Sequence, residues 1–340
     1  MRHRSHLRRW RRLVARLSLL SLTCGLVVGL GPGAQAATQA LPAKIVISAY
    51  LSDPLCVRAA SDGTTVTVEH CGQVPPVVPS TMQFRPAPVT NSVKLTIGDN
   101  RCLSVPGSST AVGTRIAQES CANAARMYWY FDRWDDVTYK LRNGHSGLCL
   151  SLNGTRTYAV QEPCSYADDW AVSPIGGRTT FRAGHSGKCL DVDDSGGDDV
   201  SGAPAQQWTC LGPDQDNQQF TLELDSLPRL DYDLPARYGL RARHSGLCLD
   251  HAQNFRNGAR VRQRPCDYYT GGWYLNPIDL NGASMVFQVW EDHSHAYDRT
   301  CLDVDNTGGG LQDGTKAQIW LCLGSGQTNQ LWRLVQFVTT

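Results

Sequence analysis

Apolar and polar residues alternate over short stretches along most of this chain, and one such stretch occurs three times in similar form. The segments are LRNGHSGLCL, FRAGHSGKCL and LRARHSGLCL, which begin at Leu141, Phe181 and Leu240. Each predicts a short strand, a His-Ser-Gly turn and a second strand that starts at the cysteine, because alternation interrupted by a glycine turn is typical of a hairpin. The chain beyond its first 36 residues has no long helical periodicity. The pattern therefore predicts an all-β protein.

The hairpin belongs to a longer unit that occurs six times. Each unit opens with Cys-Leu or Cys-Val, continues through Gly, Asn and Asp turns to a second cysteine, and closes on an aromatic residue. The closing residues are Phe84, Trp129 or Phe131, Trp170, Phe220, Trp273 and Trp332. A single unit of this size cannot bury its apolar face, so neighbouring units are expected to share a core.

The units contain twelve cysteines, two in each unit. This regular order favours one disulfide within each unit, although the order alone does not fix the connectivity. The expected pairs are Cys56 with Cys71, Cys102 with Cys121, Cys149 with Cys164, Cys189 with Cys210, Cys248 with Cys266, and Cys301 with Cys322. No Cys-x-x-Cys motif is present, so the cysteines do not indicate a zinc site.

Residues 1–36 have the pattern of a secretory signal peptide. Seven arginines and no acidic residue precede an apolar run from Leu17 to Leu30, and Ala34-Gln35-Ala36 supplies a cleavage site of small residues. The run is short for a membrane span, so an uncleaved anchor is the less favoured alternative. We expect cleavage before Ala37 and a secreted, extracellular protein, where disulfides persist.

Removal of the seven arginines takes the formal net charge from +1 to −6. A mildly acidic chain lacks the basic surface that nucleic acid and anionic lipid require, so neither partner is expected. No second apolar stretch is long enough to span a bilayer, so membrane insertion is not expected either.

The sixth unit resembles one repeat of the ricin B-chain type β-trefoil lectins. It reads CLDVDNTGGGLQDGTKAQIWLCLGSGQTNQLW from Cys301 to Trp332, and the shared features are Cys-Leu-Asp-Val, Gln-Ile-Trp before the second cysteine, and the closing Asn-Gln-Leu-Trp. The fourth unit, Cys189 to Phe220, has the matching features, with Gln-Gln-Trp before the second cysteine and Asn217-Gln218-Gln219-Phe220 at its close. The other four units keep the framework alone. The resemblance covers almost the whole chain after residue 36.

Three repeats close one trefoil in that family, so the resemblance implies two tandem β-trefoils, each of three disulfide-containing repeats. The first is expected over residues 37–175 (repeats 1–3) and the second over 178–338 (repeats 4–6). A six-bladed propeller is the alternative, since its blades have a similar length. The closing Gln-x-Trp pattern favours the trefoil.

The resemblance also implies a carbohydrate-binding set in two of the six repeats. The residues are Asp191, Gln206, Trp208, Asn217 and Gln218 in the fourth repeat, and Asp303, Gln318, Trp320, Asn329 and Gln330 in the sixth. The acid would accept hydrogen bonds from two neighbouring hydroxyls, the indole would stack on the sugar ring, and the amides would orient the carboxylate or contact the ligand. The alternative is that the acids hold turns and the tryptophans pack in the core.

The other repeats lack the acid, the aromatic residue, or both. The residues at these two places are Arg58 and Glu69 in repeat 1, Ser104 and Glu119 in repeat 2, Ser151 and Glu162 in repeat 3, and Asp250 and Arg264 in repeat 5. These four repeats are therefore predicted to lack the sugar site. The first trefoil is expected to serve as a spacer, a dimer surface or a contact for a partner protein.

Two segments resemble the start of a calcium loop, DVDDSGG from Asp191 and DVDNTG from Asp303. The bidentate glutamate that such a loop needs at its twelfth position is replaced by Gly202 and Gly314, so neither a metal nor a cofactor is expected. The chain also lacks a Gly-x-Ser-x-Gly motif. Because the six repeats cover almost all of the sequence after residue 36, a separate catalytic domain is not expected.

These observations predict a secreted lectin that recognises galactose-type, xylose-type or polymeric glycans without catalysis. The main alternative is a glycan-targeting subunit of a secreted toxin or enzyme complex. A hydrolase with an unrecognised site in the first trefoil is the third hypothesis.

Overall fold

The computed structural model describes residues 44–71, 82–97, 100–135, 137–197, 200–228, 230, 234–251, 256–266, 272–280, 285–291 and 299–337. These residues form 24 strands and five short 3-10 helices, with no α-helix among them, which confirms the all-β fold class. None of them forms a helix with the length and hydropathy of a membrane span. The predicted signal segment, residues 1–36, lies outside the described residues.

Every repeat contributes four strands in the same order. The first three repeats contain β1 (Lys44–Ala49), β2 (Leu55–Ala59), β3 (Val66–His70) and β4 (Met82–Pro86); β5 (Val93–Ile97), β6 (Arg101–Ser104), β7 (Ala117–Ser120) and β8 (Trp129–Arg133); and β9 (Tyr139–Asn143), β10 (Cys149–Leu152), β11 (Ala159–Glu162) and β12 (Trp170–Pro174).

The last three repeats follow the same plan. They contain β13 (Arg178–Ala183), β14 (Cys189–Val192), β15 (Ala205–Trp208) and β16 (Phe220–Ser226); β17 (Arg237–Ala242), β18 (Cys248–His251), β19 (Ala259–Arg264) and β20 (Gly272–Asp279); and β21 (Met285–Glu291), β22 (Thr300–Val304), β23 (Thr315–Leu321) and β24 (Leu331–Phe337). The 3-10 helices are η1 (Pro106–Ser108), η2 (Ala125–Met127), η3 (Asp216–Gln218), η4 (Thr307–Gly309) and η5 (Thr328–Gln330).

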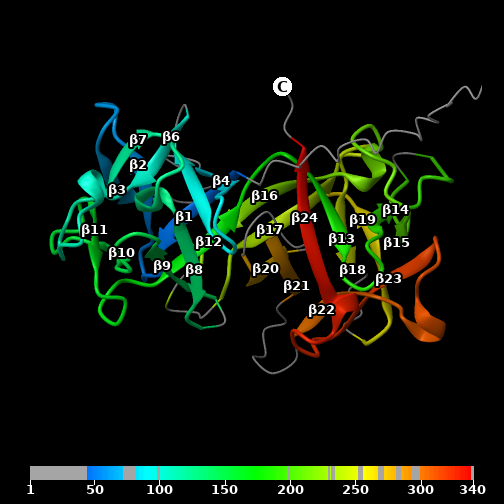
Figure 1. Ribbon diagram of the computed structural model, residues 1–340. Helices are drawn as coiled ribbons and strands as arrows, with labels where there is room; N and C mark the ends of the chain where they lie inside the picture. Colours follow the sequence, from blue (N-terminus) through cyan, green and yellow to red (C-terminus); the bar gives the residue numbers. More distant parts are fainter. Residues whose placement is uncertain are drawn as a thin grey trace, which may run out of the picture. The chain divides into compact units, whose positions relative to one another are not determined.

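The first and fourth strands of three successive repeats form a closed antiparallel ring (Figure 1). One ring runs β1–β4–β5–β8–β9–β12 and returns to β1. The other runs β13–β16–β17–β20–β21–β24 and returns to β13. The second and third strands of each repeat form a hairpin, as in β14–β15 and β22–β23. Two six-stranded rings with three hairpins each are two β-trefoils, which confirms the predicted architecture over the propeller.

The closing tryptophans fill the cores of the two trefoils. Trp129, Trp170, Trp273 and Trp332 are each 0% exposed. Each indole Nε1 donates a hydrogen bond of 2.9–3.0 Å to the backbone oxygen of the leucine that follows the first cysteine of its repeat: Leu103, Leu150, Leu249 and Leu302. A buried indole N–H needs such an acceptor. The closing residue of each of these repeats therefore ties its hairpin to the ring.

All six predicted disulfides are present, with Cα–Cα distances of 4.9–5.1 Å. Each bridge closes a loop of 15–21 residues within one repeat, and a loop of that size stabilises a domain by about 3 kcal/mol when the unfolded chain is constrained. One bridge per repeat matches one hairpin per repeat.

The three His-Ser-Gly turns have a shared structural role. Their serines Ser146, Ser186 and Ser245 each donate a hydrogen bond of 2.7–2.8 Å to a fully buried glutamine on the third strand of the same repeat. The glutamines are Gln161, Gln207 and Gln263. The turn is thereby fixed against its own hairpin.

A loop of each repeat also contacts the next repeat around the second ring. Backbone N–H groups in these loops donate to the third strand of the neighbour, from Gly202 to Gln263, from Gly258 to Ile319 and from Gly314 to Gln207, at 2.8–2.9 Å. The three glycines have φ angles of +94°, +86° and +80°, a backbone region that residues with a side chain rarely adopt. The loops therefore link repeat 4 to repeat 5, repeat 5 to repeat 6, and repeat 6 to repeat 4.

Candidate functional site

The fourth repeat brings all five of its predicted site residues to one place. Asp191 lies on β14, opposite Gln206 on β15, and is only 3% exposed. Its Oδ1 accepts a hydrogen bond from Nε2 of Gln206 at 2.9 Å. Its Oδ2 accepts from Nδ2 of Asn217 and Nε2 of Gln218, both at 3.1 Å. Three amides therefore hold one buried carboxylate in a fixed orientation.

The sixth repeat builds the same arrangement. Asp303 on β22 faces Gln318 on β23 and is 3% exposed. Its Oδ1 accepts from Nε2 of Gln318 at 2.9 Å, and its Oδ2 accepts from Asn329 at 2.8 Å and Gln330 at 3.2 Å. The corresponding distances in the two repeats differ by no more than 0.3 Å.

The short helices η3 and η5 place the Asn-Gln pairs beside the hairpins. Asn217 donates to the backbone oxygen of Val192, the residue that follows the acid on β14, at 2.9 Å. Gln218 donates to the backbone oxygen of Thr209 and accepts from the backbone N–H of Leu211, both at 3.0 Å. The equivalent bonds of the sixth repeat join Asn329 to Val304, and Gln330 to Leu321 and Leu323. Each amide is thus held by backbone as well as by the acid.

The two predicted platform tryptophans differ from the closing tryptophans. Trp208 is 38% exposed and Trp320 is 37% exposed, whereas the closing tryptophans are fully buried. Trp208 lies two residues after Gln206 on β15, so the two side chains leave the same face of the strand. An indole that remains accessible beside a buried acid offers an apolar surface next to a hydrogen-bond acceptor. The alternative of core packing is therefore wrong for these two residues.

Burial shifts the ionisation of both acids. It raises the pKa of Asp191 to about 6, and the hydrogen bonds from Gln206 and Gln218 oppose part of that rise. Burial also raises the pKa of Asp303 against the hydrogen bonds from its amides. The carboxylate form of Asp191, which only accepts hydrogen bonds, prevails above pH 6.

The acids that follow in the two calcium-like segments have a local role. Asp193 Oδ1 accepts a hydrogen bond from the backbone N–H of Ser195 at 3.1 Å, and Asp305 Oδ1 accepts from that of Thr307 at 3.0 Å. Hydrogen bonding from the side chain and then the backbone of Ser195 lowers the pKa of Asp193, and that from Thr307 lowers the pKa of Asp305 in the same way. The backbone bonds fix a turn. Among the described residues, no group of three His, Cys, Asp or Glu side chains is placed to hold a metal ion.

In repeats 1 and 2 the places of the acid and the indole are filled by polar pairs. Arg58 pairs with Glu69 in repeat 1. In repeat 2, Ser104 donates to Oε2 of Glu119 at 2.6 Å, and Nε of Arg126 donates to the same oxygen at 2.9 Å. Arg126 was not identified from the sequence, although it occupies the place of Asn217 when the closing aromatic residues are aligned. These contacts satisfy the polar groups internally and leave no indole platform.

Repeats 3 and 5 depart from the site in different ways. In repeat 3, Ser151 donates to Oδ2 of Asp168 at 2.7 Å, so a carboxylate is present but comes from the place of Gln218. Asp168 could have been found in the sequence, because it lies two residues before the closing Trp170 just as Gln218 lies two before Phe220. In repeat 5, Asp250 forms an ion pair with Arg264, with 3.4 Å between Oδ2 and Nε. The guanidinium there takes the place of the platform.

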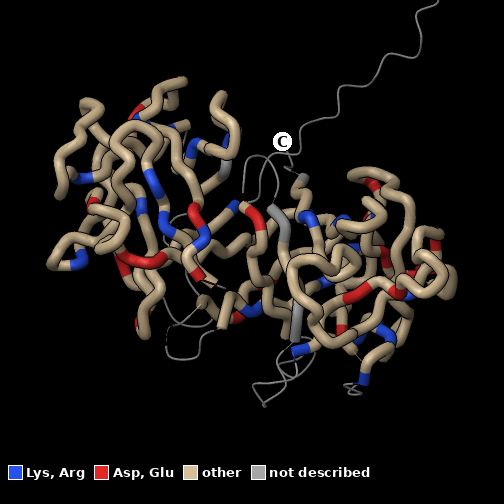
Figure 2. The backbone as a smooth tube through the Cα atoms, turned by 60° about the horizontal axis from the view of Figure 1, so that its bottom comes forward, with Lys and Arg blue, Asp and Glu red and all other residues tan. Residues whose placement is uncertain are grey.

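Charged residues of both signs are interspersed along the described backbone (Figure 2). Most ion pairs join neighbouring strands or loops, as in Arg142 with Asp132 and Arg241 with Glu223. The two acid-and-amide clusters contain one ionisable group each, since their other members are amides and an indole. The geometry suits a ligand that offers hydroxyl groups and C–H faces rather than charge.

Comparison with solved structures finds similar trefoils. A designed threefold symmetric protein, ThreeFoil, is 32% identical with a TM-score of 0.38, covering 47% of this chain and 99% of that chain. A ricin B-like lectin of Macrolepiota procera, solved in complex with lactose, is 18% identical with a TM-score of 0.34, covering 47% and 96%. The Rhizoctonia solani agglutinin is 19% identical with a TM-score of 0.37, covering 48% and 97%.

The family assignment rests on a match of the sequence to a family model. No curated protein matches the chain. The family model described as "Ricin-type beta-trefoil lectin domain-like" matches residues 83–166 and 166–264, together more than half of the 340 residues. With two closed trefoils and six repeats of one design, the chain belongs to the family of ricin-type β-trefoil lectin-like proteins.

Proposed function

We propose that the protein is a lectin that binds neutral glycans through its fourth and sixth repeats, without chemical change to the ligand. The observation that supports this proposal is the duplicated cluster of a buried carboxylate, three amides and an accessible indole. The carboxylate accepts hydrogen bonds from two adjacent sugar hydroxyls, and the indole stacks on the C–H face of the ring. Because the amides already hold the acid in place, little orientation is lost when the sugar binds.

The ligand class that we propose is galactose-type, xylose-type or polymeric glycan, which is the range that the family resemblance implies. The contacts are few and both indoles are partly exposed, so a single site is expected to bind weakly. A dissociation constant near 1 mM corresponds to only about −4 kcal/mol, which two charge-assisted hydrogen bonds and one stacked ring can supply. A glycan array followed by isothermal titration calorimetry would identify the sugar, and an assay for released reducing sugar would test the absence of catalysis.

Replacing both platforms tests the site assignment. The double variant Trp208→Ala/Trp320→Ala is expected to lose retention on every glycan that the parent binds, because both stacking surfaces are removed. The fold should persist, since these indoles are 38% and 37% exposed. Retention is measured on immobilised glycan and folding by circular dichroism.

The first trefoil offers a matched control for that experiment. Trp134 is 59% exposed and lies outside both clusters, so Trp134→Ala removes an accessible indole without touching either site. This variant should bind like the parent. Full glycan binding by the double variant would refute the assignment of both sites.

We further propose that residues 1–36 are a cleaved signal peptide, that the two trefoils span residues 37–175 and 178–338, and that the protein is secreted. Six disulfides support an oxidising destination, because such bonds persist outside the cytosol. Expression in a secreting host followed by N-terminal sequencing should give Ala37 as the first residue in the medium. Protein that stays with the cells and keeps Met1 would contradict this.

A further inference from the structure

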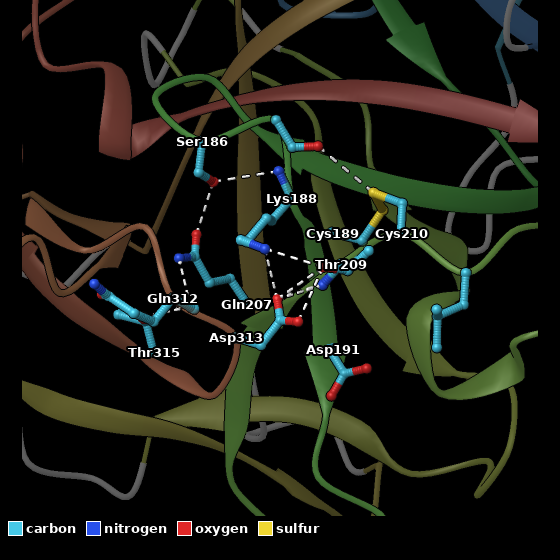
Figure 3. Close-up of polar contacts among 12 residues, drawn as sticks. Ser186, Lys188, Cys189, Asp191, Gln207, Thr209, Cys210, Gln312, Asp313 and Thr315 are labelled. Atoms are coloured by element: carbon cyan, nitrogen blue, oxygen red, sulfur yellow. Dashed lines mark hydrogen bonds and ion pairs between the residues drawn. A yellow bond between two sulfur atoms is a disulfide. The ribbon is translucent and has the colours of Figure 1, made fainter. Parts of the chain in front are cut away.

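The site of repeat 4 is bordered by a side chain from repeat 6. Asp313 accepts a hydrogen bond on Oδ1 from the backbone N–H of Thr209 at 2.7 Å, directly after the platform Trp208 (Figure 3). Both carboxylate oxygens also accept from the hydroxyl of Thr209, at 2.9 and 3.0 Å, and Nζ of Lys188 lies 2.6 Å from Oδ1. The contacts of Asp313 with Thr209 span 104 residues of sequence, and its contact with Lys188 spans 125. They fix the backbone at the point where β15 ends.

The site of repeat 6 has the same kind of neighbour, from repeat 5. Asn257 accepts a hydrogen bond on Oδ1 from the backbone N–H of Leu321 at 2.7 Å, directly after the platform Trp320. The geometry repeats that of Asp313 although one side chain is an acid and the other an amide. What the two share is an oxygen aimed at the N–H group that follows the indole.

The glycines that follow these two residues lie against the indoles. A methyl group added to Gly314 would lie 3.7 Å from Cζ3 of Trp208, and one added to Gly258 would lie 3.8 Å from Cζ3 of Trp320. The same positions are 3.8 Å from Oε1 of the site glutamines Gln206 and Gln318. The loop of the neighbouring repeat therefore forms one border of each candidate site.

The contact between the loop of repeat 4 and repeat 5 differs from the other two inter-repeat contacts. The loop of repeat 4 approaches repeat 5 through Gly202, and Ser201 stands where Asp313 and Asn257 stand in the other loops. In repeat 5 the platform is replaced by Arg264, and the next residue is Pro265, which has no backbone N–H to donate. The loop of repeat 4 keeps its backbone bond from Gly202 to Gln263. Within the described residues of this trefoil, the side-chain bond to the N–H group after the platform occurs in the two repeats that have the indole, and Pro265 excludes it in the repeat that lacks the indole.

We propose that Asp313 and Asn257 are positioning residues of the two sugar sites, each acting on the site of the next repeat. In repeat 4, Trp208 is the last residue of β15, so the ladder alone does not restrain the backbone beyond it. In repeat 6, Trp320 is the last residue but one of β23, and Leu321 is its last ladder position, paired with Thr300. In both repeats the bond from the neighbouring loop holds the N–H group that follows the indole, and with it the angle of the indole over the acid. A displacement near 1 Å is enough to weaken a stacked contact. Repeat 5, which lacks its own complete set, thereby completes the site of repeat 6.

The inference rests on the proposed lectin function and is tested in variants with one remaining site. Trp320→Ala leaves the site of repeat 4, and Trp208→Ala leaves that of repeat 6. Asp313→Ala should lower the affinity for galactose or xylose oligosaccharides about tenfold in the Trp320→Ala background and leave it unchanged in the other. Asn257→Ala should show the opposite selectivity. Titration calorimetry measures both.

Conservative and matched variants separate positioning from general stability. Asp313→Asn keeps the acceptor oxygen and should restore most of the affinity that Asp313→Ala loses. Ser201→Ala changes the equivalent loop residue beside the repeat without an indole and should leave both sites unchanged. Equal weakening of both sites by Asp313→Ala, or no weakening of either, would overturn the inference.

A readout without ligand keeps this inference distinct from the lectin proposal. In sugar-free protein, Asp313→Ala should shift or broaden the indole N–H resonance of Trp208, and Asn257→Ala that of Trp320, while the other indole signals stay in place. Selective shifts without any sugar binding by the parent would support the positioning and refute the function. Unchanged indole signals together with unchanged sugar affinity would refute the positioning alone.

Discussion

At the scale of single residues, position on the strand decides what a tryptophan does in this protein. Trp332 lies near the start of a ring strand, where its indole enters the core and donates to a backbone oxygen. Trp320 lies near the end of a hairpin strand and remains accessible. Both roles follow from the repeat pattern, because the closing aromatic residue and the platform occupy fixed places relative to the second cysteine. The sequence therefore predicts five site residues in each of two repeats, and the structure brings each set together.

The raised pKa of Asp191 leads to a pH-dependent affinity at the fourth repeat. In the Trp320→Ala background, sugar affinity should be constant above pH 6 and fall about tenfold per pH unit well below it, because the protonated acid loses acceptor capacity. Protonation does not unfold the protein through this group. Its folded pKa of about 6 lies above the ordinary value of 3.8, so the ionised acid opposes folding above pH 6, and that opposition is relieved as the pH falls toward 3.8.

Titration calorimetry between pH 7.5 and 5 measures this dependence, with circular dichroism as the check on folding. Asp191→Asn in the same background is the control, since an amide carries no titrating proton there. Equal affinity at pH 7.5 and pH 5 would contradict the proposed role of the carboxylate.

At the scale of elements, each repeat combines one ring-strand pair, one hairpin and one disulfide. The cysteine order and the aromatic spacing predict these parts because they are local to a repeat. The residues that the sequence did not indicate are of two kinds. Arg126 and Asp168 are charged residues at places where the fourth repeat has the amides of Asn217 and Gln218. Asn257 and Asp313 bond to a different repeat from their own. Nothing in the pattern of one repeat indicates a partner 64 or 104 residues away. Only closure of the ring brings these loops to their sites.

A Trp→Ala substitution is expected to have different effects on a ring strand and on a hairpin strand. Trp332→Ala should lower the free energy of unfolding by about 3–5 kcal/mol, because it empties a buried site and leaves the oxygen of Leu302 without its donor. Trp320→Ala should change it by less than about 1 kcal/mol while removing sugar affinity from the sixth repeat. Chemical denaturation compares the two. Similar destabilisation by both variants would contradict the assignment of Trp320 to a surface platform.

At the scale of the whole molecule, both complete clusters belong to one trefoil, in repeats 4 and 6. Two weak sites on one closed ring bind a multivalent surface more tightly than either binds a single sugar, since the second contact forms at high effective concentration. In the first trefoil, the corresponding places of repeats 1 and 2 are occupied by internal ion pairs. The chain thus divides into a trefoil with two candidate sites and one whose contribution to binding is expected to be indirect.

Avidity gives a direct prediction for the paired sites. The parent should be retained on polymeric glycan at least about a hundredfold more strongly than Trp320→Ala, whereas the affinity of the remaining site for free oligosaccharide should be unchanged. Surface plasmon resonance on immobilised polymer and calorimetry with oligosaccharide measure the two quantities. If the parent and Trp320→Ala dissociate from the polymer at the same rate, the two sites do not act together.

The pairing of β13 with β24 has a practical consequence for this trefoil. Arg178 is the cross-strand partner of Phe337, and the two strands stay in register for six residue pairs. The place where the chain enters the second ring is therefore also the place where it leaves. In a chain that consists of the second trefoil alone, a short peptide joining these ends would produce a circular chain. New termini opened in an exposed turn would then give a permuted trefoil with unaltered strand order around the ring, to which another protein could be fused at the new ends.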